Sequence, residues 1–264
     1  MTLQMSDRRY ALRGKRILVT RPRAQAADLC NKLAAQGAEP ILFPTIEIAP
    51  LDDYTALDRA VAALNNYHWI IFTSVNGVAA FWSRSDLTGL KDLSGLCHVA
   101  AIGPATARAL EKRGVRAHFI PDEYVAEAIV DGLADVRGQW ILLPRADIAR
   151  EVLAVELANR GAVVHEIAAY RTLPAAPDPE GLCELRRGVD AITFASASAA
   201  RNFVALTQYP SHPSHPFHLL TKIACIGPIT AQTAREVGLP VDVMACDYTM
   251  DGLVAALLDY FSRI

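Results

Sequence analysis

Two short segments of the sequence share a pattern that can bind an anion. Residues 101–107 read AIGPATA and residues 225–231 read CIGPITA, and each follows an apolar run and precedes a stretch with helical spacing. Proline suits the first position of a helix, and the amides after it have no partner inside the helix. Each segment therefore predicts a strand-to-helix turn, at Gly103 and at Gly227, whose N–H groups can receive an anion. The alternative is a tight turn in which the threonine of each copy only helps to cap its helix.

Other polar side chains follow short apolar runs, where they could also meet carboxylates. Arg21 follows the run at residues 16–20, and Arg145 follows the run that begins at Trp140. A guanidinium can hold a carboxylate through two parallel hydrogen bonds, although arginines at strand ends could equally be structural. Hydroxyl and amide side chains follow two further runs: Ser74, Asn76, Ser196 and Ser198.

An alternation of strands and helices must position these side chains. The patterns predict strands at about residues 16–20, 69–74 and 117–120, and helices at about residues 24–36, 54–64 and 124–133. The continuous apolar run at 69–74 is typical of a strand buried on both faces of a parallel sheet. The alternation predicts an α/β protein with doubly wound parallel sheets and ligands at the carboxyl ends of the strands.

The sequence pattern begins again near Trp140, so the chain contains an internal repeat. Residues of the first half recur 124 positions later: Ile17 and Ile141, Arg21 and Arg145, Gly37 and Gly161, Gly103 and Gly227, Tyr124 and Tyr248. Others recur 122 positions later: Phe72 and Phe194, Ser74 and Ser196, Phe81 and Phe203. We therefore expect two halves of similar structure.

Two proline-flanked extended segments lie outside this simple alternation. Residues 39–50 and 163–172 hold corresponding places in the two halves. The first segment contains three prolines, and the second is followed by a proline-rich segment at residues 174–179. If they pair as an antiparallel ladder, the chain crosses between domains at each of them. The halves of the repeat then need not be the domains, and spacing alone leaves this topology open.

Length, composition and charge narrow the function. The 264 residues are enough for two α/β domains of about 100–150 residues. A formal net charge of −2 without an extended basic run argues against a nucleic-acid partner. No apolar run approaches the roughly 20 residues of a membrane span. The first residues lack the apolar core of a signal peptide, which predicts a cytoplasmic protein.

The cysteines and histidines do not predict a metal site. The five cysteines form no CxxC and mostly lie in apolar segments, so we expect buried free thiols. His212, His215 and His218 are spaced at i, i+3 and i+6, which suggests a metal. The prolines among them and the absence of a nearby carboxylate or cysteine favour an exposed loop instead.

Several motifs together resemble the uroporphyrinogen-III synthase family, over nearly the whole chain from Gly14. Each motif alone is common, but their order and spacing are specific. They are TRP at 20–22, FTSVNGV at 72–78, IGPATA at 102–107, AYRT at 169–172, FASASAARNF at 194–203, IGPITA at 226–231 and YTMDGLV at 248–254.

The resemblance implies two similar α/β domains joined by a two-stranded antiparallel linker, with the active site in the cleft between them. It implies a first domain at 14–38 and 178–264, a second at 52–162, and linker strands at 39–51 and 163–177. The family suggests a monomer.

The resemblance also implies the reaction. The substrate would be hydroxymethylbilane, a linear tetrapyrrole with eight carboxylate arms, which loses its terminal hydroxyl and closes with inversion of the last pyrrole. No cofactor is implied. A pyrrole nitrogen can itself expel the hydroxyl, so positioning should contribute more than acid catalysis.

The family's tyrosine in the crossing strand matches Tyr170, which we expect to donate the proton. The alternative is a tyrosine that packs between the domains. The expected substrate-binding residues are Arg21, Ser74, Asn76, Gly103, Thr106, Arg145, Ser196, Ser198, Gly227, Thr230, Tyr248 and Thr249, of which Thr249 is also a plausible helix cap.

Two other functions fit parts of the pattern. One is a non-catalytic two-domain protein that closes on an anionic small molecule. The other is a nucleotide-dependent transferase with paired doubly wound domains, which is weakened because neither first turn carries GxGxxG or a P-loop.

Overall fold

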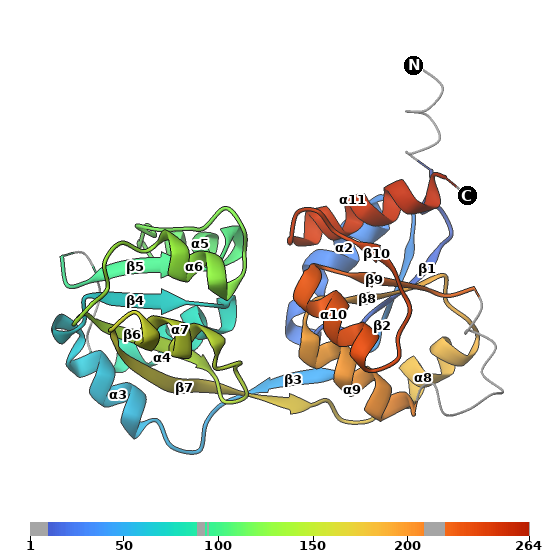
Figure 1. Ribbon diagram of the computed structural model, residues 1–264. Coiled ribbons are helices and arrows are strands. Elements are labelled where there is room, and N and C mark those ends of the chain that lie inside the picture. The colour runs from blue at the N-terminus through green and yellow to red at the C-terminus, as the bar shows by residue number, and fades with distance from the viewer. Residues whose placement is uncertain (1–9, 89–92, 94, 209–219, 264) are drawn as a thin grey trace. The chain divides into compact units, whose positions relative to one another are not determined.

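Figure 1 shows a computed structural model of the chain, which describes residues 10–88, 93, 95–208 and 220–263. The chain separates into two compact units. Unit 1 comprises Met1–Glu47 and Leu173–Ile264, and unit 2 comprises Ile48–Thr172. The segments predicted as linkers contain strands of both units.

Unit 1 is built on a sheet that, among the described residues, has five strands in the order β10-β9-β8-β1-β2. They are β1 (Arg16–Val19), β2 (Glu39–Leu42), β8 (Ala191–Phe194), β9 (Lys222–Cys225) and β10 (Val241–Met244), and each neighbouring pair is parallel. The helical segments of the unit are η1 (Arg23–Gln25), α2 (Ala27–Ala35), α8 (Pro179–Arg186), α9 (Ala197–Thr207), α10 (Pro228–Glu236) and α11 (Met250–Phe261).

Alternate residues of these strands bury opposite faces of the sheet, as the side-chain period of two requires. Leu18 packs with residues of α8, α9 and α10, whereas its neighbours Ile17 and Val19 pack with α2 and α11. Helices therefore cover both faces of the sheet (Figure 1). This arrangement confirms the predicted doubly wound fold for unit 1.

Unit 2 has a second sheet, with five strands among the described residues in the order β3-β7-β6-β4-β5. They are β3 (Ile46–Ala49), β4 (Trp69–Phe72), β5 (His98–Ala101), β6 (Trp140–Ala146) and β7 (Val163–Pro174). The helical segments are α3 (Thr55–Ala62), η2 (Leu64–Asn66), α4 (Val75–Thr88), α5 (Pro104–Glu111), α6 (Ala126–Gly132) and α7 (Val152–Asn159).

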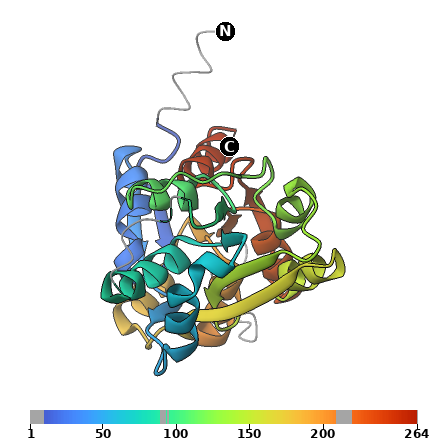
Figure 2. The same cartoon turned by 90° about the vertical axis from the view of Figure 1, so that its left-hand side faces the viewer.

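The two faces of the unit 2 sheet are again covered by different helices (Figure 2). Phe72 packs with α3, α4 and α5, whereas the adjacent Ile71 packs with α6 and α7. Pairs β4–β5, β4–β6 and β6–β7 are parallel. The strand β3 lies beside β7, and the chain enters unit 2 along β3 and leaves it along β7.

The internal repeat is visible in side-chain packing. Phe72 and Phe81 meet edge to face with ring centroids 5.5 Å apart, and Phe194 and Phe203 do so at 5.4 Å. The predicted similarity of the two halves is therefore confirmed at these positions.

The predicted strand at residues 117–120 is wrong, although its counterpart by the repeat is β10. In unit 2 this segment forms only an isolated bridge between Ala100 and Phe119. In unit 1 the ladder continues with a hydrogen bond from Ala245 N–H to Cys225 O, 3.0 Å long. The equivalent of Ala245 is Pro121, which has no N–H to donate, so the ladder is shorter there.

The cysteines are free, as predicted, but they are not all buried. Cys225 is buried, Cys30 and Cys97 are half-buried, and Cys183 and Cys246 are exposed. Cys183 lies in α8, whose pattern of apolar residues alone did not show which face is turned outward. Within the described ranges, no helix has the length and apolar character that a membrane crossing requires.

Gly252, in the first turn of α11, has no space for a side chain. A Cβ there would lie 2.0 Å from the carbonyl oxygen of Asp247. We expect Gly252→Ala to lower the free energy of unfolding by at least about 2 kcal/mol, measured by urea denaturation. Gly14→Ala is the control, because Gly14 has a φ of 72° but open space around an added Cβ. That control should cost about 1 kcal/mol, and a smaller loss at Gly252 than at Gly14 would contradict the prediction.

Candidate active site

Tyr170 is joined to Ser74 at the carboxyl edge of the unit 2 sheet. Their hydroxyl oxygens are 3.0 Å apart, and the oxygen of Ser74 also accepts the N–H of Gly77 at 2.9 Å. Ser74 therefore caps the start of α4 while it contacts the phenol. Tyr170 lies in β7, and only 8% of the residue is exposed.

The surroundings of Tyr170 keep its phenol protonated. Burial raises the pKa of Tyr170 above its ordinary value. Hydrogen bonds with Ser74 and Asn76 and the positive charge of Arg145 act in the opposite direction, but burial has the larger effect. At neutral pH the group is a neutral hydroxyl that can donate a proton or a hydrogen bond.

Arg145 lies in β6 and is neutralised within unit 2. Its Nη1 donates to Oε2 of Glu166 at 3.1 Å, and its Nη2 donates to the carbonyl oxygen of Arg150. Only 6% of the residue is exposed. Burial lowers the pKa of Arg145, and Glu166 opposes this shift. These contacts favour an anchoring role for Arg145 over the predicted binding role.

Arg21, its counterpart in unit 1, has much weaker partners. Nη1 lies 3.0 Å from the sulfur of Met250, and Nη2 lies 3.3 Å from Oε1 of Gln25. The buried Nε of Arg21, like that of Arg145, has no hydrogen-bond partner among the described residues. Among the described residues, Arg21 also forms no ion pair with a carboxylate. Burial lowers the pKa of Arg21, and Asp28 opposes this shift. A half-buried guanidinium without a counterion is suited to bind an anion.

The two Gly-Pro turns begin helices, as predicted. Gly103 and Gly227 are the N-cap residues of α5 and α10, with extended φ values of −177° and −178°, and a proline follows each. Because these glycines have no side chain, a tyrosine ring can pack closely against each of them. A Cβ on Gly103 would lie 3.0 Å from the ring of Tyr124, and one on Gly227 would lie 3.1 Å from the ring of Tyr248.

The sequence did not predict that Tyr124 packs on Gly103 or that Tyr248 packs on Gly227. In both pairs the tyrosine follows the glycine by the same number of residues. This packing leaves the amides of the helix start, rather than the face of the glycine, as the surface open to a ligand. Thr106 and Thr230 lie in the first turns of these helices and are 3% and 5% exposed, so little of either can touch a ligand.

The hydroxyl residues of unit 1 lie at two other helix starts. Ser196 is the N-cap of α9, and its oxygen accepts the N–H of Ala199 at 3.2 Å, while Ser198 is half-buried in the first turn. Thr249 is the N-cap of α11, and its oxygen accepts the N–H of Gly252 at 3.0 Å, which confirms the predicted cap.

The structure brings one set of predicted residues together in unit 2, where Ser74, Asn76 and Arg145 each interact with Tyr170. In unit 1 the contacts are separate: Tyr248 covers Gly227, and Arg21 contacts Met250, the first residue of α11. The histidines at 212, 215 and 218 lie outside the described residues.

Known proteins are similar to this chain over most of its length. A family model described as Uroporphyrinogen-III synthase HemD matches residues 27–255. A uroporphyrinogen-III synthase of Synechococcus elongatus is 35% identical over 249 residues, which cover 92% of this chain and 94% of the relative. A uroporphyrinogen-III synthase of Chlorobaculum parvum is 30% identical over 240 residues, which cover 87% and 92%.

Solved structures share the fold. A crystal structure of a mutant uroporphyrinogen III synthase from the thermophilic bacterium Thermus thermophilus aligns with a TM-score of 0.66 and 25% identity, covering 95% of this chain and 98% of that chain. Uroporphyrinogen-III synthetase from Helicobacter pylori aligns with a TM-score of 0.59 at 18% identity, over 93% and 99%. The family match spans most of the sequence and both units, and this chain belongs to the uroporphyrinogen-III synthase family.

Proposed function

We propose that this chain converts hydroxymethylbilane to uroporphyrinogen III, with loss of water and inversion of the last pyrrole ring. The match of residues 27–255 to the family carries this proposal. As a member of the family, the chain is a hydro-lyase of tetrapyrrole biosynthesis. The proposal assigns the reaction to residues of the candidate site.

Tyr170 is the proton donor in this proposal. Electrons from a pyrrole nitrogen break the bond between the terminal carbon and its hydroxyl, and the phenol proton of Tyr170 goes to the departing oxygen, which leaves as water. The cation that remains is attacked by the α-carbon of the last pyrrole that carries the bridge to the third pyrrole. The bond from this carbon to the bridge then breaks, the bridge carbon becomes the new cation, and the free α-carbon of the last pyrrole, now inverted, attacks it. Loss of the proton from that carbon completes the type III ring. The buried, neutral phenol beside Ser74 supports this role, because it still holds its proton at neutral pH.

Substrate carboxylates are held mainly by neutral donors, since the chain carries a net charge of −2. The donors in this proposal are the amides at the starts of α5 and α10 and the hydroxyls of Ser196, Ser198 and Tyr248. Each hydrogen bond to a charged group contributes about 1.5–3 kcal/mol. Arg21 adds a guanidinium that forms no ion pair with a carboxylate of the described residues. Distributed donors of this kind favour one folded conformation of a flexible substrate.

The product of the reaction tests the proposal. Incubation with freshly prepared hydroxymethylbilane should give the type III ring, identified by chromatography of the oxidised porphyrins. A non-catalytic binding protein would give only the type I ring that forms spontaneously. Heat-denatured protein is the control, and type I product alone from the folded protein would overturn the assignment.

A further inference from the structure

The amino ends of the strands, at the opposite edge of each sheet from Tyr170 and Arg21, are anchored in the same way in both units. In unit 1, Oδ2 of Asp190 accepts the N–H of Arg16 at 2.8 Å. In unit 2, Nδ1 of His68 accepts the N–H of Trp140 at 3.0 Å. His68 and Asp190 are 122 positions apart, which is the spacing of the repeat in this region. An imidazole thus takes the place of a carboxylate in unit 2.

A second pair of anchors repeats the same exchange. Oδ2 of Asp242 accepts the N–H of Ile223 at 2.9 Å in unit 1. Nδ1 of His118 accepts the N–H of Val99 at 3.0 Å in unit 2. His118 and Asp242 are 124 positions apart, as the repeat predicts. The main-chain geometry is the same in the two halves while the chemistry of the side chains differs.

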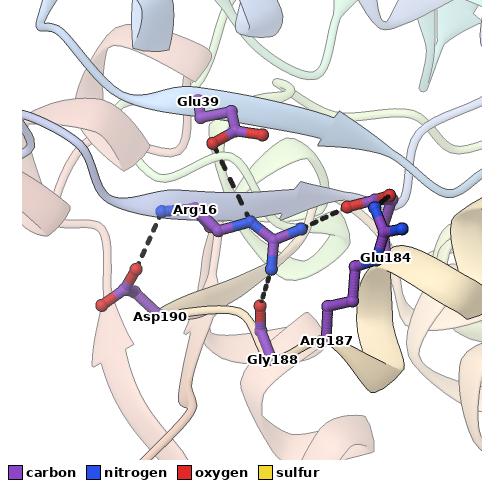
Figure 3. Close-up of polar contacts among 6 residues, drawn as sticks. All are labelled: Arg16, Glu39, Glu184, Arg187, Gly188 and Asp190. Carbon is purple, nitrogen blue, oxygen red and sulfur yellow. Dashed lines mark hydrogen bonds and ion pairs between the residues drawn. The ribbon is translucent and has the colours of Figure 1, made fainter.

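In unit 1 the charged side chains at this edge pair with one another. The second oxygen of Asp190 meets Nζ of Lys15 at 3.0 Å, and that of Asp242 meets Nζ of Lys222 at 3.4 Å. The guanidinium of Arg16 lies among several acceptors (Figure 3). These acceptors are Glu39, Glu184 and the carbonyl oxygen of Gly188.

In unit 2 the corresponding edge is open. The positions of the two lysines are held by Gln139 and His98. Among the described residues, Nε2 of His68 and of His118 has no hydrogen-bond partner, and Oε1 of Gln139 is buried without one. These side chains line a cavity of about 560 Å³, within the range of about 300–1,000 Å³ usual for small-molecule sites. Figure 2 views unit 2 from this side.

The lining favours an uncharged ligand over an ion. No lysine or arginine lines the cavity within the described part of the chain, and its one carboxylate, Asp135, is paired with Arg137 at 2.6 Å. No three His, Cys, Asp or Glu side chains among the described residues are arranged to hold a metal ion. Burial also raises the pKa of Cys97, on the cavity wall, to about 11, so its thiol stays protonated.

Aromatic rings give the cavity a flat surface. The rings of Trp69 and His98 are 4.9 Å apart and tilted by 36°, and those of His98 and His118 are 5.0 Å apart at 87°. A further planar ring can pack favourably against aromatic rings that meet in these offset and edge-to-face arrangements. Nδ1 of His68 and Nδ1 of His118 each accept a hydrogen bond from a main-chain N–H. The proton of each neutral imidazole therefore lies on Nε2, which is a donor.

We propose that this cavity binds an uncharged, planar heteroaromatic molecule. The molecule stacks on the Trp69 and His98 rings and accepts hydrogen bonds from Nε2 of His68 and His118. The site is separate from the proposed reaction at the carboxyl edge, and binding there is measured without the substrate.

Binding can be followed by NMR of protein with ¹⁵N-labelled histidine rings. Adenine, uracil and nicotinamide are the probes, and succinate is the charged, non-aromatic control. We expect at least one probe to shift the ring signals of His68, His98 and His118 in a saturable way, and succinate to leave them in place. No saturable shift with any of the three probes would overturn the proposal, as would an equal shift with succinate.

Two substitutions separate binding from anchoring. His68→Asp and His118→Asp copy unit 1, because a carboxylate still accepts the main-chain amide but offers no N–H donor. Each should leave the thermal unfolding temperature nearly unchanged and weaken probe binding at least about tenfold. Unchanged affinity in both variants would show that these groups do not bind the probe.

Discussion

Replacing Arg21 with glutamine is expected to lower kcat/KM for ring closure by about 10- to 100-fold, mainly through a higher KM. The guanidinium is half-buried, and among the described residues its contacts are a thioether and an amide oxygen. A substrate carboxylate would be its first full counterion, and a charge-assisted hydrogen bond contributes about 1.5–3 kcal/mol. Because little in the folded protein depends on Arg21, the free energy of unfolding should change by less than about 1 kcal/mol.

Arg145→Gln is the matched comparison, because the repeat places the two arginines at equivalent positions. Arg145 is already paired with Glu166, and removal of the guanidinium leaves that carboxylate uncompensated. Breaking a buried pair costs about 3–5 kcal/mol, but the Glu166 side chain is 33% exposed, so we expect a loss of about 1–3 kcal/mol in unfolding free energy. Urea denaturation and steady-state kinetics on both variants measure the contrast. A destabilised Arg21→Gln with normal KM, or a stable Arg145→Gln with raised KM, would reverse the assigned roles.

This contrast marks what a sequence can and cannot predict. The strand-to-helix turns were predictable because their causes are local: an apolar run, then glycine, then a proline that fits the first helical position. The repeat extended this to tertiary structure, since Phe72 and Phe81 have the same edge-to-face contact as Phe194 and Phe203. Local rules and duplicated spacing together predicted the α/β fold.

Partners that depend on strand register were not predictable. Arg145 meets Glu166 because β6 and β7 lie side by side, whereas the equivalent position of β2, which lies beside β1, is held by Leu42 and offers Arg21 no carboxylate. A single missing N–H at Pro121 was enough to reduce the expected strand at 117–120 to one bridge. A repeat in sequence thus predicts equivalent backbone positions, while the chemistry at each position depends on side chains that the two halves do not share.

As the proposed proton donor, the phenol of Tyr170 should set the pH range in which the reaction proceeds at its full rate. Burial raises its pKa above the ordinary value of about 10. The proton is therefore present throughout the neutral range, and the acid-dependent part of the rate should fall only in alkaline solution, above about pH 10.

The folded state holds the proton of the Tyr170 phenol more tightly than the unfolded state. Its contribution to stability is therefore complete below about pH 10 and is lost as the pH rises through the raised pKa.

Tyr170→Phe should slow ring closure by about 100-fold without abolishing it. General acid catalysis contributes about 10²–10⁴-fold, and the lower end applies because a phenol with a raised pKa is a weak acid and the pyrrole nitrogen supplies much of the driving force. Positioning of the substrate, which contributes up to about 7–11 kcal/mol, is retained, so the product should remain type III.

Tyr54→Phe is the control for removing a hydroxyl from unit 2, because the Tyr54 oxygen accepts the N–H of Leu51 at 3.1 Å and has no part in the candidate site. It should leave kcat unchanged. Single-turnover kinetics with analysis of the ring isomers measures both variants. Complete loss of activity in a folded Tyr170→Phe protein would mean that proton donation, rather than the shape imposed on the substrate, controls the reaction. A rate equal to that of the unmodified chain would instead leave Tyr170 as a packing residue whose hydroxyl serves only to orient Ser74 at the start of α4.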